Sequence, residues 1–129
     1  MRLAAIVWLL GWAVFGLPLE GVRSRPRLNH VQVVPFEQPG PRDTVRNLVY
    51  YIPMGLIGAA LGWRSSAVVG AAALLSGGTE VAQLFAASER YPSTTDVVLN
   101  VGGAIVGIAI ADALRRLWRA SQARAPERA

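Results

Sequence analysis

The chain has 129 residues, of which 53% are hydrophobic and only 16% are charged, and its formal net charge is +5. Soluble domains carry about 25% charged residues, so this composition favours a single-domain membrane protein. The absence of cysteine excludes disulfides, thiol catalysis and cysteine-ligated metal. All basic residues are arginines that flank apolar runs, which is typical of topology signals and argues against a nucleic-acid partner.

Four apolar stretches approach the length of about 20 residues that a helix needs to cross a bilayer. They cover residues 3–19, 47–63, 66–87 and 95–114. The first follows Arg2 as in a signal peptide, but no small-residue cleavage site comes after it, so we expect an uncleaved helix. The sequence therefore predicts an all-α polytopic membrane protein, with four transmembrane helices in a small antiparallel bundle.

These stretches divide the chain into four expected regions. They are a first transmembrane helix (1–19), an extracytoplasmic loop (20–46), a three-helix core (47–114) and a basic cytoplasmic tail (115–129). The loop contains a short apolar run, Val31 to Phe36, which we expect to lie in the membrane interface or re-enter it. Two or three residues around Arg64 separate the second and third helices, which must then form an antiparallel hairpin. Residues 120–129 are expected to be disordered.

Orientation follows from the distribution of arginines. With the N-terminus inside, seven arginines lie on the cytoplasmic side and six on the other. Acidic residues accompany the outer arginines, among them Glu20, Glu37 and Asp43, and this favours the same orientation. The sequence predicts a multi-pass protein of the cell membrane with both termini in the cytoplasm.

Glu80 is the most informative polar residue because it lies inside the third apolar stretch. An ionised carboxylate near the middle of a membrane helix costs about 2.5 to 3.5 kcal/mol on insertion scales. We therefore expect Glu80 to face the interior of the bundle, to pair with a cation or to stay protonated. Ser76 and Gln83 are four and three residues away, so one wall of this helix is polar.

The fourth stretch carries a matching polar wall, because Asp96 and Asn100 are four residues apart. The short link after the third helix makes the two helices antiparallel, which brings Glu80 toward Asp96. Arg90 lies in that link as the natural counter-charge, and Asn47 begins the second helix at the same depth. The candidate polar cluster comprises Asn47, Ser76, Glu80, Gln83, Arg90, Asp96 and Asn100.

Several interpretations of this cluster remain open. Polar side chains hold membrane helices together, so the cluster is either purely structural or a binding site. Its oxygen atoms could bind a hard cation, and Glu80 or Asp96 could act as acid–base groups on a lipid-linked substrate. No nucleophile or metal-ligand pattern supports an enzyme, and His30, the single histidine, has no co-ligand. We expect no cofactor and no resident metal.

The motifs of the three later helices resemble those of VanZ-like membrane proteins. The run from Asn47 through Pro53 to Gly55 is similar to the second-helix signature of that family, and the block from Ser76 to Phe85 is similar to its third helix. The closing motif is represented by Arg90, Ser93 to Asp96, Asn100, Gly103 and Gly107, and Val34 to Phe36 resembles the segment before the second helix. The likeness covers about residues 30–112.

This resemblance implies a short polytopic membrane protein of the bacterial cell envelope. The family is named after a teicoplanin-resistance accessory protein, and it carries no established biochemical activity onto this chain. It implies partners beyond the lipid bilayer: a lipid-linked or cell-wall component, or another membrane protein. The long first loop and the arginine-rich tail depart from the family pattern, so no function is transferred to them.

The predicted topology can be tested with reporter fusions placed after Glu37 and after Ala120. Four spans with both termini inside require the first fusion to report the outer compartment and the second the cytoplasm. Reports from the same compartment would contradict the predicted topology.

Overall fold

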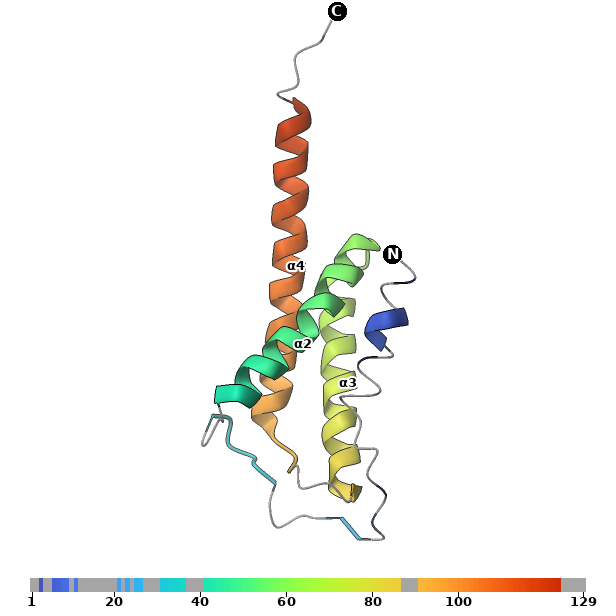
Figure 1. Ribbon diagram of the computed structural model, residues 1–129, viewed down its shortest axis with the longest axis vertical. Helices are drawn as coiled ribbons and strands as arrows, with labels where there is room; N and C mark the ends of the chain where they lie inside the picture. The colour runs from blue at the N-terminus through green and yellow to red at the C-terminus, as the bar shows by residue number, and fades with distance from the viewer. Residues whose placement is uncertain are drawn as a thin grey trace, which may run out of the picture.

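The computed structural model describes residues 3, 6–9, 11, 21, 23, 25–26, 31–36, 41–86 and 91–123. Three helices have described bounds: α2 (Pro41–Ala60), α3 (Ser65–Phe85) and α4 (Thr94–Ala123). The described residues 3, 6–9 and 11 are helical as well. Helix α2 crosses α4 obliquely, α3 runs antiparallel to α4, and α4 extends far beyond both (Figure 1). The predicted all-α class is confirmed.

Two of these helices, α3 and α4, are long and apolar enough to cross a membrane. Helix α2 has 20 residues, but Arg42, Asp43 and Arg46 occupy its first two turns and leave a shorter apolar stretch. A bilayer core needs about 20 predominantly apolar residues, so α2 falls short in composition. The prediction of four spans therefore stays a prediction.

Helix α2 begins six residues before the start expected at Asn47. Proline suits the first helical position because its φ is preset and its missing N–H has no partner to lose there. Asp43 lies in the first turn, where its negative charge interacts favourably with the positive end of the helix dipole. Its carboxylate is 2.8 Å from the guanidinium of Arg46. The apolar stretch in the sequence predicts the middle of this helix, but the start of the helix is polar and lies outside that stretch.

The end of α2 is fixed by a glycine turn. The N–H of Trp63 donates to the carbonyl of Gly58 and that of Gly62 to the carbonyl of Ala59, both at 3.0 Å. Gly62 has φ of +77°, the left-handed conformation that this helix-ending motif requires. Helix α3 starts three residues later, at Ser65, so the predicted antiparallel hairpin is confirmed. Gly62 thus serves the turn, and a Cβ there would meet no atom within 4 Å.

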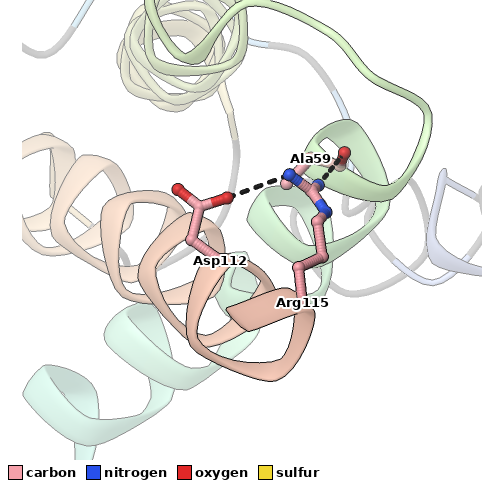
Figure 2. Close-up of polar contacts among 3 residues, drawn as sticks. All are labelled: Ala59, Asp112 and Arg115. Carbon is pink, nitrogen blue, oxygen red and sulfur yellow. Dashed lines mark hydrogen bonds and ion pairs between the residues drawn. The ribbon is translucent and has the colours of Figure 1, made fainter. Parts of the chain in front are cut away.

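The same end of α2 is tied to α4 by Arg115 (Figure 2). Its Nη2 donates to the carbonyl of Ala59, which belongs to the last turn of α2. Its Nη1 donates to Oδ1 of Asp112, one turn earlier on α4, at 2.9 Å. The carbonyl of Ala59 already accepts the N–H of Gly62, so Arg115 adds a second hydrogen bond there and fixes where α4 passes α2.

Helix α4 ends at Ala123, nine residues beyond the expected end at Leu114. Residues 120–123 are helical, so the expected disorder from residue 120 was wrong there; residues 124–129 lie outside the described part. The arginines after Leu114 end the apolar stretch without ending the helix, because Arg, Leu and Ala are all good helix formers. With 30 residues, α4 is about 45 Å long.

The first helical segment packs against α2 through Trp8. Its indole N–H donates to the carbonyl of Tyr50 at 3.0 Å. Its ring meets that of Tyr51 edge to face, with centroids 5.9 Å apart. Tyr51 is buried at the centre of the apolar core, so this contact places the first segment on the bundle.

Helices α2 and α4 touch backbone to backbone along a row of glycines. A Cβ atom at Gly55 would collide with the carbonyl of Ala104, and one at Gly103 would collide with the carbonyl of Leu48. Gly107 approaches the backbone of α2 in the same way. These small residues therefore let the two helix backbones approach closely.

Gly103→Ala should therefore lower the thermal stability of the protein in detergent. Overpacking a close contact costs about 1 to 3 kcal/mol, which circular dichroism would show as a reduced midpoint of unfolding. Gly70→Ala is the matched control, because a Cβ there meets no atom within 4 Å and alanine favours a helix. Equal midpoints for the two variants would contradict the glycine contact.

Candidate functional site

The polar face of α3 is buried as the sequence predicts. Ser76 and Gln83 have exposed fractions of 0% and 4%, and Thr79 between them is buried too. The hydroxyl of Thr79 donates a hydrogen bond to the carbonyl of Leu75 at 2.9 Å, within the same helix. The other polar groups of this face are thus directed at neighbouring helices.

Asn100 of α4 contacts this face directly. Its Nδ2 donates to Oγ of Ser76 at 2.8 Å, and both residues are buried. The bond joins two helices at the level that their antiparallel order predicts. It leaves Oδ1 of Asn100 as an acceptor without a partner.

Glu80 lies one turn further along α3 and binds the start of α4. Its Oε2 accepts a hydrogen bond from the backbone N–H of Ser93 at 2.7 Å. Ser93 immediately precedes the first residue of α4. The first N–H groups of a helix lack internal partners and carry partial positive charge, so this backbone contact stabilises the carboxylate of Glu80.

Asp96 lies in the first turn of α4 and connects the cluster to α2. The side chain of Asn47 interacts with the carboxyl group of Asp96. The Nδ2 atom of Asn47 nevertheless has no hydrogen-bond partner of normal geometry among the described residues. Asp96 and Glu80 are close enough for their charges to repel each other. The predicted convergence of three helices therefore brings together Asn47, Ser76, Glu80, Asp96 and Asn100.

Arg90, the predicted counter-charge, lies outside the described residues. Within the described ranges, the ion pairs join Arg46 to Asp43 and Arg115 to Asp112, so neither Glu80 nor Asp96 takes part in one. Arg46 attracts Asp96 from the rim of the cluster. No three histidine, cysteine, aspartate or glutamate side chains gather as metal ligands in these ranges.

Several buried polar atoms of the described residues are unsatisfied, and all but that of Tyr50 belong to the cluster. In the part of the chain that the structure describes, atoms without a hydrogen-bond partner are Asn47 Nδ2, Tyr50 Oη, Gln83 Oε1 and Asn100 Oδ1. Leaving such an atom unpaired costs about 1 to 3 kcal/mol. These atoms therefore keep their capacity for a further hydrogen bond.

Sequence reasoning missed the segment that closes this end of the bundle. The short apolar run of residues 31–36 pairs with the connection between α3 and α4. The N–H of Gln32 donates to the carbonyl of Pro92 at 3.0 Å, and the N–H of Thr94 donates to the carbonyl of Gln32 at 3.1 Å. Phe36 N–H donates to Oγ1 of Thr95 at 2.8 Å. Hydroxyl residues before an apolar helix are a capping signal. This signal could have indicated Ser93 as the residue before α4, but not the segment of residues 31–36 that pairs with it.

The Ser76–Asn100 bond can be measured with a double-mutant cycle of Ser76→Ala and Asn100→Ala. Interhelical hydrogen bonds in membranes have coupling energies averaging about 0.6 kcal/mol and reaching about 1.7 kcal/mol. We expect a coupling in this range from unfolding in mixed micelles. Ser121→Ala, an exposed serine bonded within its own helix, should show no coupling to Asn100→Ala. Additive effects of the Ser76 and Asn100 changes would refute the bond.

Comparison with known proteins gives one finding that fits this geometry. The model of the VanZ/LLP1 family matches residues 3–115, which include every helix with described bounds except the end of α4. Searches of curated proteins and of solved structures returned no match. The matched range covers most of the chain, and two of its helices have the length and apolarity of membrane spans. The chain is a membrane protein that belongs to the VanZ/LLP1 family.

Proposed function

We propose that this chain is a multi-pass protein of the bacterial cell envelope whose polar cluster binds a polar head group. The cluster is defined as Asn47, Ser76, Glu80, Gln83, Asp96 and Asn100, with Arg90 as its expected seventh member. In this proposal the chain has four spans and cytoplasmic termini, and the cluster opens at the outer face of the membrane.

The observation that carries the proposal is the set of unsatisfied buried atoms. Gln83 and Asn100 are more than nine-tenths buried, and each has an amide oxygen with no described partner. Neighbouring helices that only needed to be held together would use these atoms in bonds with each other, as Asn100 Nδ2 does with Ser76. A polar molecule entering between α3 and α4 would satisfy them.

A structural role is the second candidate, and a specific contact favours it. The bond from Ser93 to Glu80 fixes the start of α4 against α3, so Glu80 contributes to the fold whether or not it binds anything. The two candidates differ in what a change of charge does. A structural role needs a hydrogen-bond acceptor at position 80, whereas a binding role can depend on the negative charge itself.

Glu80→Gln and Asp96→Asn separate these roles because each keeps the shape and an acceptor oxygen. We expect both variants to unfold within a few degrees of the wild type, yet to retain several-fold less lipid after detergent exchange from bilayers of phosphatidylethanolamine and phosphatidylglycerol. Native mass spectrometry of the full chain measures the retained lipid.

Asp112→Asn is the matched control, because it removes an exposed carboxylate of α4 far from the cluster. It should retain lipid like the wild type. Wild-type retention by Glu80→Gln and Asp96→Asn would reject head-group binding. A lower unfolding midpoint that accompanies the lost lipid would favour the structural role.

A further inference from the structure

We infer that the polar cluster takes the ammonium group of a membrane lipid, a head group of the ethanolamine kind. This inference rests on the proposed function and adds the chemical class of the ligand. It follows from a count of the donors and acceptors that the described helices leave unused.

Acceptors exceed donors in the cluster. Its unpartnered buried atoms are the amide oxygens of Gln83 and Asn100 and one donor, Nδ2 of Asn47. The carboxyl groups of Glu80 and Asp96 add further acceptor oxygens. A ligand that fits must therefore donate several hydrogen bonds, and an ammonium group carries three donors and no acceptor.

Charge leads to the same class of ligand. Glu80 and Asp96 repel each other, and within the described ranges neither forms an ion pair. Two carboxylates at the end of membrane helices are costly unless a cation lies between them or beside them. An ammonium group placed there supplies that cation together with its hydrogen bonds.

The rim of the cluster suits the remainder of such a lipid. Arg46 lies near Asp96 with a half-exposed guanidinium that is already paired with Asp43 at 2.8 Å. A guanidinium has five N–H donors, so it can also bind the phosphate that follows an ethanolamine. Three apolar side chains stand exposed on the segment bonded to Thr94 and Thr95: Val33, Val34 and Phe36, at 68%, 58% and 50%. Their place beside the first turn of α4 favours an amphiphile over a free amine or a metal ion.

The test compares phosphatidylethanolamine with its N-acetyl derivative, in which the amine is capped but the phosphate and chains are unchanged. The full chain in nanodiscs of each lipid, diluted in phosphatidylcholine, is exchanged into detergent, and retained lipid is counted by native mass spectrometry. We expect about tenfold to hundredfold greater retention of the uncapped lipid, the factor of one charge-assisted hydrogen bond. Glu80→Gln and Asp96→Asn should each reduce this preference, and Asp112→Asn should keep it.

Each other result contradicts a defined part of the inference. Equal retention of both lipids, with loss in Glu80→Gln, would reject the ammonium and leave a head-group site; this is also the result expected if Arg90 occupies the two acids. Displacement of the lipid by free ethanolamine or by Mg²⁺ at equal concentration would reject the lipid as the source of the cation. Retention that no cluster variant changes would reject the proposed function itself.

Discussion

The start of α4 depends on a single carboxylate supplied by another helix. Glu80 accepts the N–H of Ser93 at 2.7 Å, so an acid that would be costly in lipid is placed where the backbone already carries positive charge. That bond sets the depth of α4 against α3. The bond between Asn100 and Ser76 follows one turn along, and the approach of Asn47 to Asp96 follows from the packing of α2 on α4. The cluster thus lies where α4 is held at the residue before its first turn.

Helical periodicity makes much of this arrangement predictable from the sequence. A spacing of four places Ser76 with Glu80, and Asp96 with Asn100, and the short links fix the antiparallel order, so the meeting of α3 and α4 is readable from the chain alone. The glycines of α2 and α4 were readable for a similar reason: small residues four apart form a groove. These successes share one cause, since helical periodicity determines which side chains lie on the same face.

What the sequence did not indicate depends on atoms that have no periodicity. The bond of Glu80 goes to a backbone N–H and not to a basic side chain, and backbone donors are the same at every position. The polar turns at the start of α2 and the end of α4 are helical for reasons of capping and propensity, which a search for apolar stretches does not register. The attachment of residues 31–36 to Thr94 and Thr95 joins positions about 60 apart in the chain, and nothing local specifies it.

The anchoring of α4 by Arg115 has a mechanical consequence. Helix α4 has no proline from Thr94 to Ala123, and Arg115 attaches it to the last turn of α2 (Figure 2). The exposed end beyond that point carries Leu117 and Trp118, and the opposite end carries Asp96 and Asn100. Because Ser93 and Asn100 also fix the first half of α4 to α3, the segment beyond Arg115 projects past α2 and α3 as a continuous helix (Figure 1).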